Sequence, residues 1–415
     1  MRSHTGKIVL IAAVCATTPL INPVPATAGA RAEATVITRW NAAAERTVFT
    51  ENNTPIPPSV VYFGYVSLAV YDAVVAIEGG YRPYLRQPRA DRRASIEAAA
   101  ATAAHHVLIH YFPASAANLD ADLAASLADV GDGWRKTAGQ RVGAGAAARL
   151  IAARTGDGLN ADIRLTTTPA PGVWRPTPPA FADMTAPWLG FLRPLTLRSP
   201  TQQHLHGPDS IDSRAYRRDL AEVRAYGSAT GSARTPGQTE TALFFNANAV
   251  AQYQTAMRDQ VIRRGYDAVR AARAFALLNV TTLDAHIRCW RAKYDFAYWR
   301  PITAIREGSI DPDPAWTPLV PNPPYPEYPS GHACLTGSFA GTLAYLFGAR
   351  SIDLTLSSSV TGTTRHYDTT AALIVDTRNA RIWLGLHFRR AMVDATAIGL
   401  YTARWVQHRH FQPTR

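Results

Sequence analysis

The chain has 415 residues, of which 47% are hydrophobic and 18% are charged. This composition excludes a largely disordered protein, and the length suffices for one or two domains with a large buried core. The formal net charge of +12 fits either a soluble basic surface or the attraction of anions to a site. The Lys and Arg residues are scattered and do not interleave with aromatic residues in a basic run, which argues against a nucleic-acid partner.

The first 28 residues have the pattern of a secretory signal peptide. Arg2 and Lys7 precede the apolar run 8–15, and residues 26–28 (Ala-Thr-Ala) have the small-x-small form of a cleavage site. The run is too short to span a bilayer, and no later stretch reads as a membrane span. We therefore expect an exported protein that is cleaved near Ala28, with an ordinary buried N-terminal helix as the alternative.

Two cysteines remain after such a cleavage, Cys289 and Cys334. In an exported chain they could form a disulfide, and they could equally be small buried hydrophobic residues. The sequence slightly favours two unpaired thiols.

Helical patterns follow the leader in chain order. Residues 59–78 end at the pair Gly79-Gly80, and a second helix starts at Ser95 and stops at Pro113. The proline-rich stretch 166–208 predicts a long ordered loop. Helices resume over 213–227, over 234–260 with Pro236 near the start, and over 267–299 before Pro301; the stretch 311–329 is again proline-rich.

Strand patterns are scarce, and only residues 351–361 (SIDLTLSSSVT) are typical of a strand. The chain is therefore predicted to be all-α, with two packed helical bundles in one domain and long proline-rich loops. That domain spans 29–415, with an N-terminal helical half over about 30–165 and a catalytic half over about 209–415.

The segment 325–332, YPEYPSGH, bends the backbone directly before a helical pattern. Pro329 suits a first-turn position, Ser330 offers a hydroxyl, and Gly331 allows a ligand to approach the backbone closely. Free N–H groups and the positive end of the helix dipole favour an anion at this point. His332 would then lie close enough to give a proton to that anion or accept one.

Two further segments carry cations. Lys293 and Arg300 are seven residues apart in KYDFAYWRP, which on one continuous helix places both on the same face. Arg381 and His387 lie in RIWLGLH, where Gly385 permits a break that turns both inward. Each residue alone is more often a snorkelling surface cation or a core histidine. Together they indicate an anion site.

These three segments, taken in order, resemble the signature of the vanadium-dependent haloperoxidases and the related acid phosphatases, the type 2 phosphatidic acid phosphatase superfamily. That signature is Lys-x6-Arg-Pro, then Pro-Ser-Gly-His, then Arg-x5-His, and all three parts occur here. The surrounding residues, together with AVYDAVVAIEGGYRPY and RTPGQTETALFF upstream, are similar to the bacterial chloroperoxidase-like branch, so the resemblance covers most of the chain after the leader.

The resemblance implies a role for each matched residue. Vanadate, or phosphate in the same site, would be held by a set of cations and donors: Lys293, Arg300, Arg381, Ser330 and Gly331. His387 would be the axial vanadium ligand, or in a phosphatase the nucleophile that forms a phosphohistidine. His332 would be the acid or base. Trp290 and Tyr325 would line the halide and substrate pocket, with ordinary core packing as the alternative.

Some positions depart from the family pattern. The acid that often follows the axial histidine by four residues is replaced by Ala391, so either Asp394 or a backbone carbonyl would orient the His387 ring. Asn248 lies near the position at which some fungal relatives pair an acid with the arginines.

Two activities share this site because vanadate and phosphate are nearly isosteric. The resemblance favours a secreted haloperoxidase that uses hydrogen peroxide to oxidise a halide to a hypohalous species, which then modifies a small organic acceptor. A secreted acid phosphatase acting through His387 is the alternative, and a binding protein with a degenerate site is a third class. The sequence leaves the halide and the oligomeric state open.

Overall fold

The computed structural model describes residues 28–414, and for residues 28–33 only the backbone. The expected signal peptide therefore lies outside the described residues, except for Ala28, where the first helix begins. The described part is all-α, as predicted, apart from one small hairpin. The proposed division into residues 30–165 and 209–415 stays a prediction.

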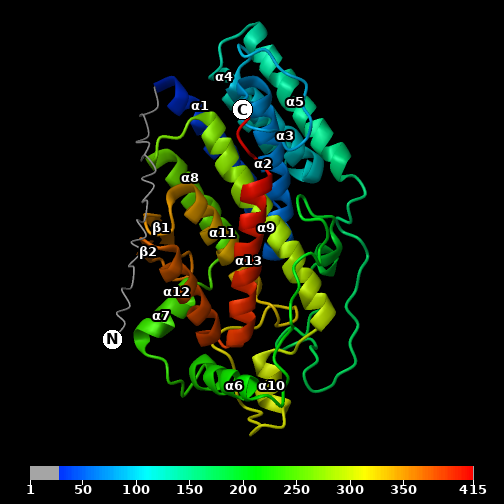
Figure 1. The fold of residues 1–415 in the computed structure, drawn as a ribbon, viewed down its shortest axis with the longest axis vertical. Coiled ribbons are helices and arrows are strands. Elements are labelled where there is room, and N and C mark those ends of the chain that lie inside the picture. The colour runs from blue at the N-terminus through cyan, green and yellow to red at the C-terminus, as the bar shows by residue number, and fades with distance from the viewer. Residues whose placement is uncertain (1–27, 415) are drawn as a thin grey trace, which may run out of the picture.

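Five helices gather at one end of the elongated molecule (Figure 1). They are α1 (Ala28–Glu45), α2 (Ile56–Glu78), α3 (Ile96–Tyr111), α4 (Ala116–Ala128) and α5 (Trp134–Arg154), with a π-helical turn at Arg46–Glu51 and a 3-10 turn at Pro113–Ser115. As predicted, α2 stops at Gly79, which has φ +75°, and the Ser95 side chain caps α3 by accepting the Ala98 N–H. Helix α3 packs against both α2 and α5.

Helix α2 corrects the expectation that no stretch after the leader could span a membrane. Its length and composition pass that test, but 89% of its most apolar window is buried inside the protein. It is the central core helix of this end of the fold.

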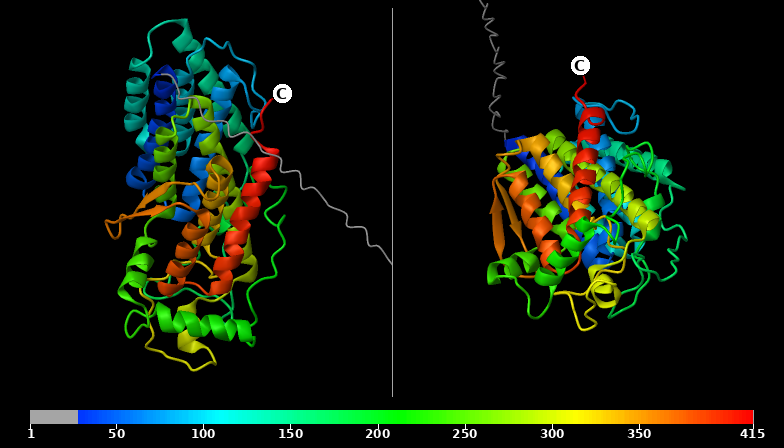
Figure 2. Two further views of the ribbon diagram at one scale, coloured as in Figure 1. Left: turned by 60° about the vertical axis from the view of Figure 1, so that its left-hand side comes forward. Right: turned by 60° about the horizontal axis from the view of Figure 1, so that its bottom comes forward.

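The other end is built from α6 (Arg214–Gly227), α7 (Pro236–Phe244), α8 (Ala249–Arg263), α10 (Pro301–Glu307), α11 (Gly331–Phe347), α12 (Thr370–Trp383) and α13 (Arg389–Arg409). Helix α9 (Ala268–Phe296) is the longest described helix, and it packs against α1, α2, α11 and α13. Figure 2 shows α9, α11 and α13 side by side from two further directions. One continuous hydrophobic core runs through both ends.

Helix α11 lies unusually close to α13. A Cβ added to Gly399 would come within 2.4 Å of the Ser338 backbone nitrogen, so only glycine allows this approach. The contact fixes the first turn of α11 against the helix that follows His387.

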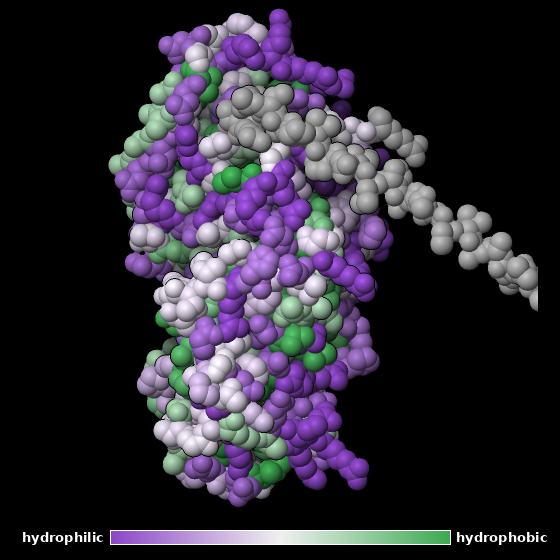
Figure 3. Space-filling model, turned by 90° about the vertical axis from the view of Figure 1, so that its left-hand side faces the viewer, coloured by the Kyte–Doolittle hydropathy of each residue, from purple (hydrophilic) through white to green (hydrophobic). Residues whose placement is uncertain are grey.

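The predicted strand forms as β1 (Leu354–Ser357), and it pairs antiparallel with β2 (Thr364–Tyr367), which the sequence pattern did not indicate. The two proline-rich stretches are loops, with a 3-10 turn at Pro187–Phe191 in the first. On the face shown in Figure 3, hydrophilic residues are mixed with small hydrophobic areas.

Candidate active site

The loop before α11 places Ser330 and Gly331 at the start of that helix. Ser330 is the N-cap residue and Gly331 the first helical residue, so Pro329 precedes the cap and is not in the first turn as expected. Because the Ser330 Oγ accepts the Ala333 N–H at 3.4 Å, its own hydroxyl hydrogen remains free to donate. The first N–H groups of a helix have no intrahelical acceptor, so the Gly331 N–H is also available.

Lys293 and Arg300 meet in space for a different reason from the one expected. They do not share a helix, because α9 ends at Phe296, Ala297 takes a left-handed conformation, and Arg300 is the N-cap of α10. Both side chains nevertheless turn to the loop before α11. The Lys293 Nζ donates to the carbonyls of Pro326 at 2.6 Å and Glu327 at 3.2 Å, which leaves one of its three N–H donors.

The Arg300 guanidinium is almost fully engaged with the backbone. Its Nε donates to the Tyr325 carbonyl at 2.9 Å, Nη2 to the Pro323 carbonyl at 3.4 Å, and Nη1 to the Leu386 carbonyl at 2.9 Å and the His387 Nε2 at 3.3 Å. One of its five N–H donors therefore remains. These contacts hold the planar group next to the His387 ring.

His387 is oriented by a carboxylate that the sequence analysis missed. The Glu327 Oε1 lies 2.9 Å from the His387 Nδ1 and also accepts the Phe388 N–H at 3.0 Å. Since Arg300 offers a donor to Nε2, the ring proton belongs on Nδ1 and Nε2 keeps a lone pair. Glu327 was visible in the sequence as the one acid within YPEYPSGH, but nothing in the sequence placed it beside a histidine 60 residues away.

Asp394, considered for orienting His387, and Asn248, considered near the position of an acid that pairs with the arginines, have other partners. Asp394 accepts from the Tyr328 hydroxyl at 2.6 Å and from the Arg390 Nε at 2.7 Å. Asn248 caps α8 through the Val250 and Ala251 N–H groups.

Gly385, with φ +78°, makes the expected break between α12 and α13 that lets Arg381 and His387 face the same region.

Two buried nitrogens near His387 have no hydrogen-bond partner. The residues that carry them complete a group, called the cage below, made of Lys293, Arg300, Ser330, Gly331, His332, Arg381 and His387. Arg381 donates through Nη1 to the Phe245 carbonyl at 3.1 Å, while its Nε is unpartnered. The His332 ring bonds to the backbone of Ala247, while its Nε2 is unpartnered. A buried polar atom without a partner costs about 1–3 kcal/mol, so the site is built for a ligand that accepts from the Arg381 Nε and donates to the His332 Nε2.

The free groups come from three separate segments: one N–H each of Lys293 and Arg300, the Arg381 Nε–H, the Ser330 hydroxyl and the Gly331 N–H can donate, and the His332 Nε2 can accept. The charges of Arg300, Lys293, Arg381 and His332 all act on His387. A tetrahedral or trigonal-bipyramidal oxyanion fits this set, because it presents oxygen acceptors in several directions and its negative charge balances the buried cations.

Burial and mutual repulsion govern the charges in this cage. Lys293 and Arg300 are fully buried, and desolvation lowers the pKa of Lys293 to about 7. Burial, together with the charges of Arg300, Lys293 and Arg381, holds the pKa of His387 well below its ordinary value. Burial raises the pKa of Glu327 to about 8, although Arg300 and Lys293 oppose this shift. His387 is therefore neutral and ready to act as a ligand or nucleophile.

Aromatic rings form one wall of the cage. The Lys293 Nζ lies 4.8 Å from the Tyr325 ring centre and 5.5 Å from that of Trp290, and the Trp290 Nε1 donates to the Thr185 carbonyl at 3.1 Å. His286, which the sequence analysis did not single out, stacks on Trp290 with a centroid distance of 5.1 Å. Its spacing of four residues from Trp290 and seven from Lys293 was the signal that could have identified it.

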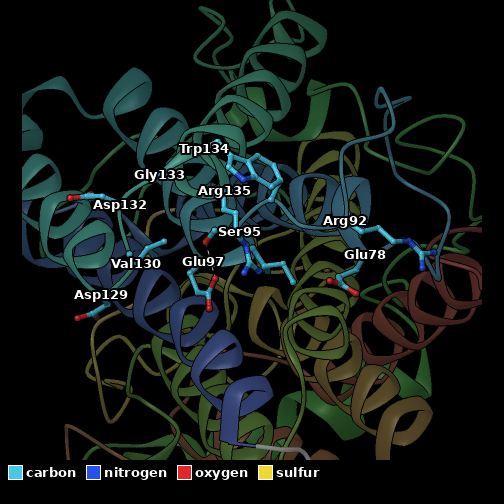
Figure 4. Close-up of a pocket in the computed structure, with 13 residues that line it drawn as sticks. Glu78, Arg92, Ser95, Glu97, Asp129, Val130, Asp132, Gly133, Trp134 and Arg135 are labelled. Carbon is cyan, nitrogen blue, oxygen red and sulfur yellow. Dashed lines mark hydrogen bonds between the residues drawn. The ribbon is translucent and has the colours of Figure 1, made fainter.

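A separate hollow of about 540 Å³ lies away from these residues, between the start of α3 and the connection from α4 to α5 (Figure 4). Its charged lining is mixed, and Ser95 donates there to Glu97 at 2.8 Å. None of the predicted site residues lines it. No group of three or more His, Cys, Asp and Glu residues suited to a metal ion occurs in the described chain.

Comparison with known proteins agrees with this geometry. Residues 273–414 match the family model of the second helical-bundle domain of vanadium chloroperoxidase. Vanadium chloroperoxidase of Curvularia inaequalis is 29% identical over 167 residues, an alignment that covers 28% of this chain and 27% of that protein's length.

Two solved structures share the fold over most of the chain. A bacterial vanadium-dependent iodoperoxidase superposes with a TM-score of 0.79 at 20% identity and covers 92% of this chain and 97% of its own. A bacterial vanadium-dependent chloroperoxidase in its holo form superposes with a TM-score of 0.70 at 17% identity, over 85% of this chain and 91% of its own. Residues 273–414 of this chain are therefore similar to the second helical-bundle domain of vanadium chloroperoxidase, and the described chain has the all-α fold of these two solved structures.

Proposed function

We propose that this protein is an exported haloperoxidase that binds vanadate in the cage around His387 and uses hydrogen peroxide to oxidise a halide. The proposal rests on two buried, unpartnered groups, the Arg381 Nε–H donor and the His332 Nε2 acceptor, beside a neutral histidine and two buried cations. The family match and the fold add support, since the named relatives are vanadium-dependent peroxidases.

Each residue of the cage would have its own role in binding vanadate. The His387 Nε2 would bind vanadium in place of its present contact with the Arg300 Nη1, with Glu327 keeping the proton on Nδ1. Lys293, Arg300 and Arg381 would neutralise the vanadate oxygens, and Ser330 and the Gly331 N–H would fix their direction. Bound vanadate would supply the Lewis acidity that polarises peroxide for attack by a halide.

His332 is the residue placed to move a proton. Burial and the charge of Arg381 hold its pKa well below the ordinary value, so the ring is neutral and its unpartnered Nε2 can accept a proton from an incoming peroxide. The Trp290 and Tyr325 rings would exclude water from the same side and border the halide path. The hypohalous product would then react with a small organic acceptor.

The test is a paired assay of the purified protein. With orthovanadate, peroxide and a halide, we expect halogenation of a phenolic dye, measured separately with chloride, bromide and iodide. His387→Ala should abolish the reaction, whereas His408→Ala, at an exposed position of α13, should leave it unchanged. Hydrolysis of p-nitrophenyl phosphate without halogenation would overturn the proposal in favour of an acid phosphatase acting through a phosphohistidine at His387.

Export is part of the same proposal and rests on the leader pattern of residues 1–28. N-terminal sequencing of protein recovered from the culture medium should begin near residue 29. Recovery of the chain only inside the cells, with Met1 or Arg2 retained, would contradict it.

A further inference from the structure

Two buried thiols lie directly behind the oxyanion cage. Cys289 on α9 and Cys334 on α11 are both free and fully buried, on two helices that pack against each other, and each thiol shifts the pKa of the other. The Cys289 Sγ lies 3.6 Å from the Pro329 carbonyl, to which it donates.

Both thiols are coupled to the cage through the backbone. Cys289 immediately precedes Trp290 and lies one helical turn before Lys293. The Cys334 N–H donates to the Ser330 carbonyl at 3.1 Å, so this thiol sits one turn behind the helix start that would hold the anion. A change of bonding between the sulfurs would therefore shift the positions of Lys293 and Ser330.

The local chemistry favours oxidation of this pair. Burial raises the pKa of Cys289, but the hydrogen bond from Cys334 and the charges of Lys293 and Arg288 outweigh burial, so that the pKa is lowered. A thiol with thiolate character is the form that peroxide attacks, and a second thiol in contact is the partner that resolves the product. A metal site does not explain the pair, because no third ligand of the kinds that bind metal joins it within the described chain.

We propose that Cys289 and Cys334 are a peroxide-oxidised dithiol pair that closes to a disulfide beside the oxyanion cage. Hydrogen peroxide first transfers one oxygen to the Cys289 sulfur, which gives a sulfenic acid and water. The Cys334 sulfur then attacks that sulfur and displaces the hydroxyl as a second water. Overall, the two thiols lose two protons and two electrons, and one peroxide becomes two waters.

The disulfide has two consequences for the site. It removes the Cys289 Sγ–H that donates to the Pro329 carbonyl, and it draws α9 and α11 together, since a covalent bond is shorter than a thiol contact. Binding sites tolerate displacements of only about 0.5 Å before affinity suffers, so the oxidised protein should bind oxyanions more weakly. Closure also protects Cys289 from irreversible oxidation next to Lys293.

The presence of peroxide at this position rests on the proposed function, but the chemistry can be tested without it. The reduced full-length protein is treated with hydrogen peroxide in the absence of vanadate and halide, then denatured, alkylated, digested and analysed by mass spectrometry. We expect the peptide with Cys289 linked to the peptide with Cys334, and reversal by dithiothreitol. Two fully alkylated cysteines, or a link from either to Cys15, would overturn the proposal.

Single variants identify the attacked sulfur. In Cys334→Ala, Cys289 should be trapped by dimedone as a sulfenic acid or gain two or three oxygen atoms irreversibly. In Cys289→Ser, Cys334 should remain alkylatable under the same treatment. Oxidation of Cys334 instead, with Cys289 left intact, would overturn the assigned order of attack. The wild-type peptide result needs no variant and stands even if one of them fails to fold.

Calorimetric titration with orthophosphate tests the consequence for the cage. The oxidised protein should bind at least several-fold more weakly than the reduced one, dithiothreitol should restore the affinity, and Cys289→Ser should show no peroxide effect. An unchanged affinity in the cross-linked protein would overturn this consequence. Absence of halogenation by the reduced, vanadate-loaded protein would instead refute the proposed function and leave the dithiol result untouched.

Discussion

The Glu327 carboxylate lies 2.9 Å from the His387 Nδ1, although 60 residues separate the two along the chain. The same oxygen accepts the Phe388 N–H at 3.0 Å, so one atom fixes both the ring and the backbone beside it. Carboxylates that orient a ligating histidine also make its other nitrogen a better electron donor. Glu327 is therefore a positioning residue for the His387 ring.

Replacing Glu327 should separate the role of its charge from the role of its acceptor when the measurement is made above pH 8, where a carboxyl with a pKa of about 8 is ionised. Glu327→Ala removes both and should lower vanadate affinity and kcat/KM for peroxide about 10–100-fold, the usual cost of losing such a partner. Glu327→Gln keeps an oxygen that can accept the Nδ1–H and should lose less. Steady-state kinetics and vanadate titration measure both effects, with circular dichroism as the control for folding. Equal losses in the two variants would show that only the charge matters.

Lys293 should have opposite effects on stability and binding. Without an anion, its fully buried ammonium is costly, so Lys293→Met should raise the melting temperature in phosphate-free buffer. The same change removes a charge-assisted donor, so affinity for orthophosphate should fall by about 1.5–3 kcal/mol, or roughly 10–100-fold. Calorimetry and thermal unfolding on one preparation measure both quantities. A variant that binds as well as the wild type would remove Lys293 from the cage.

The pH dependence follows from the lowered pKa of the same residue. The pKa of Lys293 is about 7 in the anion-free protein, so the ammonium is lost and oxyanion affinity should fall as the pH rises through about 7. Lys293→Arg stays protonated over this range and should bind with a weaker pH dependence. The ratio of the two affinities at each pH cancels the ionisation of phosphate itself. A ratio that is constant from pH 6 to pH 9 would contradict the lowered pKa.

The lowered pKa of Lys293 affects the free energy of unfolding in the opposite direction: stability rises with pH, whereas oxyanion affinity falls. The folded pKa lies below the unfolded value of about 10.4, so between these values the unfolded chain binds more protons. The contribution of Lys293 to the free energy of unfolding is therefore greatest above about pH 10 and declines as the pH falls to about 7. In denaturant titrations, the wild type should become less stable relative to Lys293→Met as the pH falls across this range.

Gly331 tests the backbone contact at the anion site. A Cβ at this position would come within 3.1 Å of the Trp290 Cζ3, so Gly331→Ala should displace the indole and weaken oxyanion binding while the Gly331 N–H is retained. Gly237→Ala is the matched control, because it is also near the start of a helix and its Cβ would meet nothing within 4 Å. Calorimetric titration with orthophosphate should show weaker binding only for Gly331→Ala. If binding falls equally in both variants, the steric explanation is wrong.

Local sequence signals were sufficient for the helical fold and for the residue types of the site. Ser95 and Gly79 marked helix ends correctly, and Gly385 marked the break that turns Arg381 and His387 the same way. These signals act over a few residues, because capping and left-handed backbone conformations depend on the nearest neighbours in the chain. The all-α class could be read for the same reason.

The pairings that make the site depend on tertiary structure. Lys293 and Arg300 were expected to share a helix face, yet a left-handed Ala297 separates them and the loop before α11 brings them together. The choice of Glu327 over Asp394 as the partner of His387, and the contact of Cys289 with Cys334, also join distant segments. Such pairs are selected by which helices pack together in one core, and no short-range preference of the chain encodes that choice.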